Sequence, residues 1–231
     1  MIFMKNMAGK ENKWDNLHSS ERFRPKYPSE HCVRFIFTQF PREFDKRKNI
    51  KILDLGCGAG RHTIFLAQEG FGTYATDFSE EGLIHLRKDV ADKKLTATLY
   101  QADMEKQPFP DNFFDGIISF GVFYYANLES YKNAVSEMYR MLKKGGKALI
   151  FTRTDDDYRF GKGRKLEKNT YILDIEDTNE KGMINHFLDR DEINEIFCQF
   201  NIINVEKTET TFSNSQKKNS DWIIIVEKQV Q

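Results

Sequence analysis

Short apolar runs and segments of helical periodicity follow one another along the middle of this chain. From residue 50 the sequence gives a β-branched run at 50–55, a helical face at 61–69 and a second run at 71–76. Short apolar runs are typical of buried strands, and a 3.6-residue period is typical of helices that cover them. The repetition predicts a parallel sheet with helices on both faces.

The same alternation continues to residue 153. A helical pattern at 79–90 precedes predicted strands at 96–101 and 113–120, and a second helical pattern at 131–142 precedes a predicted strand at 147–153. Ser79 is the expected N-cap of the first of these helices, because its hydroxyl can accept from the first free backbone N–H groups. Lys144-Gly145-Gly146 is expected to end the second.

The two ends of the chain have different patterns. Residues 1–48 are interpreted as a helical lead-in, and residues 154–188 are polar, charged and without a clear period. Such a long irregular segment persists in a compact domain mostly as a lid or a binding loop, and the alternative is a disordered surface loop. In 189–231, Asp189 and Glu192 predict a capping box, followed by two strands joined as a hairpin.

Composition excludes several classes of protein. The 231 residues are 39% hydrophobic and 30% charged, and the longest strongly apolar run, 222–226, is far shorter than the ~20 residues of a membrane span. No signal-peptide pattern is visible, and three cysteines without a CxxC motif favour a reducing cytoplasm. The five histidines have no metal-like spacing, so no metal is expected.

The formal net charge is zero, so the basic footprint of a nucleic-acid binder is missing. Basic residues are nevertheless concentrated in the lead-in and in 143–168. Two interpretations stay open: solvated surface charge, or a pair of basic segments around a site for an anionic substrate.

A glycine-rich turn carries the chemistry. Gly56, Gly58 and Gly60 follow a predicted strand and open a predicted helix, where free backbone N–H groups and the helix dipole favour a nucleotide. A dinucleotide turn of the form GxGxxG needs its third glycine at position 61, which is Arg61. Asp77 lies 21 residues after Gly56 and suits the ribose hydroxyls, although it could instead cap a helix.

These residues resemble the signature of class I S-adenosylmethionine-dependent methyltransferases, which here reads ILDLGCGAGR over 52–61. Four further segments match that family in order: ATDFS at 75–79, QADM at 101–104, PFP…FFD at 108–115 and YRMLKKGG at 139–146. The resemblance implies a three-layer, Rossmann-like α/β fold. Its mostly parallel sheet has seven strands in the order 3-2-1-4-5-7-6, with the seventh antiparallel.

The resemblance also implies that S-adenosylmethionine is the cofactor and assigns roles to residues around the turn. Gly56, Cys57 and Gly58 would pass close to the amino-acid part of the cofactor. Asp54 would help to hold its amino group, and Arg61 would meet its carboxylate by a charge-assisted hydrogen bond.

The nucleoside end of the cofactor would meet a second group of residues. Asp77 would take the ribose diol, and Phe78 would pack on the adenine. Asp103 would accept from the adenine amino group, with the Met104 backbone beside it. Phe120 would line the pocket after the fourth strand, and Tyr27 in the lead-in would cover the cofactor.

A single domain is therefore expected, with a lead-in or cover at 1–48, a cofactor-binding core at 49–153, a lid-like insertion at 154–188 and a closing helix and strands at 189–231. The reaction would be methyl transfer to a small molecule, because SFGV at 119–122 stands where many nucleobase and amide methyltransferases have Asn/Asp-Pro-Pro-Tyr/Phe.

The acceptor itself, the general base and the choice between monomer and homodimer stay open. The candidate bases and acids are His62, Tyr124, Tyr125, His186 and the acidic triplet at 155–157. Two rival functions are a nicotinamide-dependent oxidoreductase, which Arg61 disfavours, and a catalytically silent binding module, which would have an eroded glycine turn.

Overall fold

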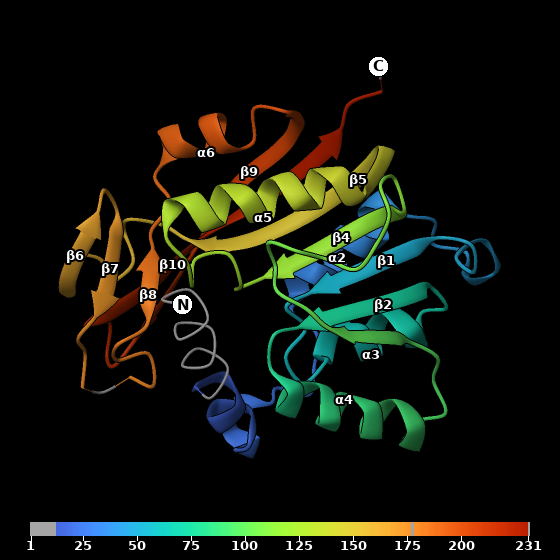
Figure 1. The fold of residues 1–231 in the computed structure, drawn as a ribbon, viewed down its shortest axis with the longest axis horizontal. Coiled ribbons are helices and arrows are strands. Elements are labelled where there is room, and N and C mark those ends of the chain that lie inside the picture. The colour runs from blue at the N-terminus through green and yellow to red at the C-terminus, as the bar shows by residue number, and fades with distance from the viewer. Residues whose placement is uncertain (1–12, 177, 231) are drawn as a thin grey trace, which may run out of the picture.

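A three-layer α/β sandwich organises the chain in the computed structural model, which describes residues 13–176 and 178–230 (Figure 1). The part of the predicted lead-in at 1–12 lies outside the described residues. The main sheet has seven strands in the order β3-β2-β1-β4-β5-β10-β9. This order is the predicted 3-2-1-4-5-7-6, since β9 and β10 are the sixth and seventh strands of this sheet along the chain.

Five strands of the main sheet run parallel. They are β1 (Lys51–Leu55), β2 (Gly72–Asp77), β3 (Thr98–Gln101), β4 (Phe114–Phe120) and β5 (Leu142–Arg153). The closing hairpin consists of β9 (Phe200–Phe212) and β10 (Lys217–Lys228), and β10 is antiparallel to both β5 and β9. Because the parallel strands share a direction, their carboxyl ends meet at one edge of the sheet.

Helices cover both faces of the main sheet. α5 (Leu128–Met141) and α6 (Arg190–Ile196) share one apolar core with the sheet, and α2 (Glu30–Gln39) and α3 (Arg61–Gln68) share the core on the opposite face. α4 (Glu80–Asp92) packs with α3 against the β2 side. Two 3₁₀ turns, η1 (Glu21–Phe23) and η2 (Phe44–Lys46), lie in the lead-in.

The predicted helix caps are confirmed at two positions. The Ser79 side chain accepts from the backbone N–H of Gly82 at the start of α4. Asp189 and Glu192 form a complete capping box at the start of α6. These side chains satisfy backbone donors that would otherwise have no partner at a helix N-terminus.

The prediction that 154–188 is irregular is wrong. This segment contains a second, antiparallel sheet of three strands, β6 (Gly163–Glu167), β7 (Thr170–Leu173) and β8 (Ile184–His186). It lies beside the N-terminal end of α5 and the closing hairpin (Figure 1). Backbone hydrogen bonds attach it to the main domain, from His186 N to Tyr124 O and from Leu188 N to Arg153 O.

Two boundaries also differ from the prediction. α5 ends at Met141, because Leu142 has extended dihedral angles and already belongs to β5, so the glycine pair lies in the strand. The hairpin strands are longer than expected, and the turn between them is only 213–216. Ser213, Asn214 and Ser215 have positive φ there. No helix among the described residues has the length and apolarity needed to cross a lipid bilayer.

Candidate functional site

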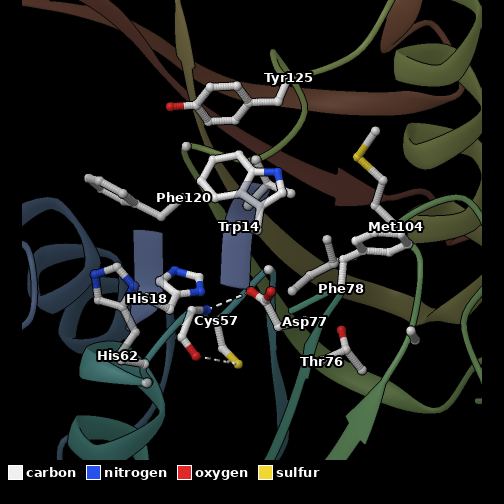
Figure 2. A pocket seen from close by; sticks show the side chains of 18 of the residues that line it. Trp14, His18, Cys57, His62, Thr76, Asp77, Phe78, Met104, Phe120 and Tyr125 are labelled. Carbon is white, nitrogen blue, oxygen red and sulfur yellow. Dashed lines mark hydrogen bonds between the residues drawn. The ribbon is translucent and has the colours of Figure 1, made fainter. Parts of the chain in front are cut away.

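A cavity of about 410 Å³ opens at the carboxyl edge of the main sheet. Its walls come from the β1–α3 turn, the ends of β2 and β4, the segment after β3 and the N-terminal residues that the structure describes. Figure 2 shows Trp14 beneath the Tyr125 ring, with Asp77 and Cys57 further down in the same view. Ligands of open α/β sheets bind at this edge, so the cavity is the candidate site.

The glycine turn forms the floor of the cavity and needs glycine for steric reasons. Gly56 has a φ of +73°, and a Cβ there would lie 2.3 Å from Val122 Cγ2. Gly60 has a φ of +87°, and a Cβ there would lie 2.1 Å from Leu86 Cδ1. Cys57 continues the turn, since its backbone N–H donates to Thr76 O at the end of β2. A side chain at either glycine would displace the wall or the helix beneath it.

Asp77 connects this turn to the end of β2. Its Oδ2 accepts from the backbone N–H of Gly58 at 2.7 Å, and its Oδ1 accepts from the backbone N–H of Ser79 at 2.8 Å. Burial raises the pKa of this carboxyl, while the backbone hydrogen bonds and nearby His18 oppose that change. Asp77 also lines the cavity, and its role toward the ribose stays a prediction, while the N-cap of α4 is Ser79.

Asp54 lies behind the turn and is only 2% exposed. The Thr63 hydroxyl donates to its Oδ2 at 2.6 Å, and His62 Nδ1 lies 3.9 Å from its Oδ1. Burial raises the pKa of Asp54 to about 6 and lowers the pKa of His62 to about 3. A histidine with so low a pKa is neutral at pH 7 and donates or accepts a hydrogen bond without charge.

The remaining predicted cofactor residues lie around the same cavity. Phe78, Asp103 and Met104 line it on the β2 and β3 side. Phe120 lines it at the end of β4 and stacks on Phe151, with ring centroids 4.1 Å apart. The Arg61 guanidinium lies 4.9 Å from the Phe120 ring centroid, on the wall that continues from the glycine turn.

The N-terminal cover of the cavity is not the one predicted. Tyr27 is 82% exposed and does not line the cavity, whereas Trp14, His18, Phe23 and Pro25 do. Tyr27 points to solvent because the 3₁₀ turn η1 and the extended residues after it carry the chain away from the cavity before α2 begins.

Two polar residues hold this cover on the start of α4. Asp15 Oδ1 accepts from Ser79 Oγ at 2.7 Å, and His18 Nδ1 lies 3.0 Å from the same hydroxyl. Residues 13–18 are helical, so Trp14 and His18 stand four positions apart on one helix face. That spacing is the signal in the sequence that could have identified the cover.

A second cavity, of about 430 Å³, adjoins the first and shares four wall residues with it. Its other walls come from the insertion and from the closing hairpin. They are lined by Tyr158, Arg159, Thr178, Asn179, Glu180, Phe212 and Asn219, and Leu17 of the N-terminal helix completes the lining. The predicted role of the insertion as a wall beside the cofactor region therefore has a geometric basis, although its fold differs from the prediction.

A buried cluster of charges underlies the second cavity. Glu180 Oε1 accepts from Arg153 Nη2 at 2.5 Å and from the Tyr125 hydroxyl at 2.6 Å. Glu180 Oε2 lies 2.9 Å from Arg159 Nε, and Arg159 also pairs with Asp157 at 2.9 Å. The two guanidinium groups keep the pKa of Glu180 below its usual value in spite of burial.

The candidate bases are spread over different environments. Tyr124 lines the first cavity and Tyr125 lines both, and burial raises the pKa of each phenol. His186 is fully buried away from both cavities, with Nδ1 2.8 Å from Thr170 Oγ1. In the parts of the chain that the structure describes, no group of three or more His, Cys, Asp or Glu side chains is arranged to hold a metal ion.

Comparisons with known proteins agree with this geometry. Residues 52–146 match the family model described as a methyltransferase domain. The ubiquinone/menaquinone biosynthesis C-methyltransferase UbiE of Burkholderia cenocepacia is 33% identical over 108 residues, which are 45% of this chain and 43% of that protein. The chain therefore matches less than half the length of such curated relatives.

Solved structures share the fold. A SAM-dependent methyltransferase from Methanosarcina mazei superposes with a TM-score of 0.72 at 17% identity, over 89% of this chain and 100% of that one. The 1,6-didemethyltoxoflavin-N1-methyltransferase of Burkholderia thailandensis, solved with its acceptor and S-adenosylhomocysteine, gives a TM-score of 0.61 at 15% identity, over 79% and 72% of the two chains.

Proposed function

We propose that this chain, whose residues 52–146 match a methyltransferase domain, is a class I S-adenosylmethionine-dependent methyltransferase that transfers a methyl group to a small-molecule acceptor. The observation that carries the proposal is the combination of a glycine turn, a buried Asp77 and an open cavity at the carboxyl edge of the sheet. Arranged in this way, they form a nucleoside site with room for a ligand.

The glycine turn and Asp77 fit the cofactor in two respects, the space that they leave and the hydrogen bonds that they can accept. Any side chain at Gly56 or Gly60 would collide with the cavity wall or α4, so the turn keeps its backbone open to a ligand. Asp77 lines the cavity, and an ionised carboxylate has lone pairs beyond the two that the backbone N–H groups use. It can therefore also accept from a diol.

The proposal keeps the roles that the family resemblance implies for individual residues. Gly56, Cys57 and Gly58 would hold the amino-acid part, with Arg61 on the same wall toward its carboxylate. Asp54 would act from behind the turn, through the backbone or a water molecule, since it is buried with Thr63.

The nucleoside would lie along the other side of the cavity. Asp77 would take the ribose, Phe78 and Met104 would pack on the adenine, and Asp103 would accept from its amino group. Phe120 would close the end of the pocket near β5. Trp14 would cover the cofactor in place of the predicted Tyr27, because Trp14 lines the cavity and Tyr27 does not.

When bound, the cofactor supplies an electrophilic methyl group on a sulfonium. The protein then mainly has to align the acceptor and exclude water, and such alignment lowers a barrier by up to ~7–11 kcal/mol. The cover at residues 13–18 and the aromatic residues after β4 shield the cavity from solvent. A proton acceptor is needed only for an acceptor that carries a proton, such as an alcohol or phenol.

A small-molecule acceptor is supported by the relatives, which are named for quinone biosynthesis and for a toxoflavin precursor. An anionic acceptor stays the untested alternative to the uncharged acceptor that is argued below. Among the basic residues of the insertion, Arg159 lines the second cavity, whereas Arg164 and Lys165 occupy exposed positions in β6. A cytoplasmic location and a monomeric or homodimeric state are likewise proposals.

Calorimetric titration tests the proposal against its rivals. The protein should bind S-adenosylmethionine and S-adenosylhomocysteine and should not bind NAD, because Arg61 stands where a dinucleotide turn needs its third glycine. Binding of NAD without S-adenosylhomocysteine would favour the oxidoreductase. Binding of neither would favour a silent module.

A further inference from the structure

We propose that the second cavity is the acceptor site and that it takes an uncharged, planar aromatic ring with a hydroxyl or carbonyl on its edge. The inference rests on the proposed function, because it assigns the acceptor of the same reaction. It goes further in naming the class of acceptor and the residues that select it.

The position of the second cavity suits an acceptor. It shares Trp14, His18, Phe23 and Tyr125 with the cofactor cavity, so a molecule in it would be a direct neighbour of one in the first. It is bounded on the far side by the insertion and the hairpin, which belong to no part of the nucleoside site. Its volume of about 430 Å³ is in the range of sites for small organic ligands.

Aromatic residues line opposite ends of this cavity in two perpendicular pairs. Trp14 and Tyr125 pack edge to face on the side of the cofactor cavity, with centroids 4.6 Å apart. Tyr158 and Phe212 pack edge to face on the other side, with centroids 5.4 Å apart. The Tyr158 ring also packs against the Arg159 guanidinium, 4.3 Å from the ring centroid. The other rings of the two pairs add ring faces and ring edges, which are the surfaces that a planar aromatic ligand prefers.

Polar groups at the rim favour a hydroxyl or carbonyl on the ring. Asn219 Oδ1 accepts from Arg159 Nη1 at 3.1 Å, so the amide NH₂ of Asn219 is the part of that side chain that can donate to a ligand. Asn179 adds a second amide to the same wall, whereas the Thr178 hydroxyl already donates to Ile175 O and accepts from the Glu180 backbone N–H. Such groups fix the orientation of a ring that the aromatic walls hold.

The Arg159 and Glu180 side chains that line the cavity already pair with each other, which favours a neutral ligand. Lys162 and Lys217 contact the Tyr158 ring but do not line the cavity. The Arg159 guanidinium is mostly buried and already pairs with Asp157 and Glu180, each at 2.9 Å. A carboxylate entering here would compete with two carboxylates for one guanidinium, in a region where charge repulsion is poorly screened. An uncharged ring avoids this cost.

Saturation-transfer NMR with three matched probes tests the inference, in the presence of saturating S-adenosylhomocysteine. The probes are 4-methylphenol, 4-methylcyclohexanol and 4-methylbenzoate, which differ in planarity and in charge. We expect 4-methylphenol to bind most tightly. Tyr158→Leu and Phe212→Leu should each lower the affinity for 4-methylphenol by roughly threefold to tenfold, since each substitution removes one aromatic surface but keeps an apolar side chain.

Phe44→Leu is the matched control, because Phe44 is an exposed aromatic residue outside both cavities, and it should leave the affinity for 4-methylphenol unchanged. Unchanged affinity for S-adenosylhomocysteine shows that each variant is folded. The inference is wrong if 4-methylphenol does not bind, if the saturated or the charged probe binds as well, or if neither cavity variant weakens binding. Failure to bind S-adenosylhomocysteine would instead contradict the proposed function.

Discussion

At the scale of single residues, the Asp77 carboxylate is buried and accepts from two backbone N–H groups, those of Gly58 and Ser79. One carboxylate oxygen therefore holds the glycine turn in place, and the other holds the start of α4. Because an ionised carboxylate accepts on both oxygens, only an acid at this position can serve both contacts and also bind a diol.

We expect Asp77→Asn to lower the affinity for S-adenosylhomocysteine roughly tenfold or more. The amide would direct an NH₂ group at one of two backbone donors, and it would lose the charge that strengthens hydrogen bonds to the ribose. Calorimetric titration measures the effect. Asp89→Asn, on the exposed face of α4, is the control and should bind like the wild type. Wild-type affinity in a folded Asp77→Asn protein would show that Asp77 does not contribute to binding of the cofactor.

Asp221 provides a pH-dependent test. Burial, together with the Asp157 and Glu180 carboxylates, raises the pKa of Asp221 to about 7 although Arg153 and Arg159 oppose it. An acid whose folded pKa is raised stabilises the fold while it is protonated, and this stability is lost as pH rises from about 4 to about 7. Over that pH interval, the free energy of unfolding of the wild type should therefore fall by at least about 1.4 kcal/mol relative to that of Asp221→Asn. Urea unfolding at pH 4.5 and 7.5 measures this difference, and a constant difference would contradict it.

Sequence reasoning identified the turn residues but not the cover. Gly56, Gly58 and Asp77 follow from the chemistry of a nucleoside site and from their spacing in one short segment. Trp14 reaches the cavity through tertiary contacts of the N-terminal helix, such as the hydrogen bond between Asp15 and Ser79, which are 64 residues apart. Tyr27 has a suitable side chain, but the path of the backbone after η1 leaves it in solvent.

At the scale of elements, strands and helices of the main domain could be predicted because their apolar residues pack on a large sheet. The insertion could not, because its strands are only three to five residues long, and β6 is exposed at every position. Alternation is not visible in such short strands. The order comes instead from a small apolar cluster of Tyr171, Leu173 and Phe187 and from the buried ion pairs of Glu180.

Glu180→Gln tests how the insertion is attached. Glu180 is the buried partner of Arg153, and its loss leaves an uncompensated guanidinium beneath the second cavity. The free energy of unfolding should fall by about 3 kcal/mol, the usual cost of breaking a buried ion pair, while S-adenosylhomocysteine still binds. Urea unfolding is the measurement.

Glu176→Gln is the matched control for that experiment. Glu176 also pairs with a cation, Lys181, but its side chain is 80% exposed, so the change should cost ~0–1 kcal/mol. Equal effects of the two substitutions would show that Glu180 does not anchor the insertion.

At the scale of the whole molecule, the order of the seven strands was predictable because parallel β-α-β units have a fixed hand and the matched segments occur in family order. The relation between the two cavities was not, because it depends on three segments far apart in sequence. The N-terminal helix, the loop after β4 and the insertion meet at Trp14 and Tyr125.

Because the two cavities share a wall, one substitution in that wall should weaken the binding of two ligands. Trp14 lines both cavities, so Trp14→Ala should lower the affinities for S-adenosylhomocysteine and for 4-methylphenol, each by roughly threefold to tenfold, through loss of apolar and ring contacts. Tyr158→Leu should weaken only 4-methylphenol, since Tyr158 lines the second cavity alone. Tyr27→Ala is the exposed aromatic control and should change neither. Titration of the three variants with both ligands measures this pattern. If Trp14→Ala lowered the affinity for one ligand and not for the other, the two cavities would not share a functional wall. The acceptor would then have to approach the cofactor from a different side of the first cavity.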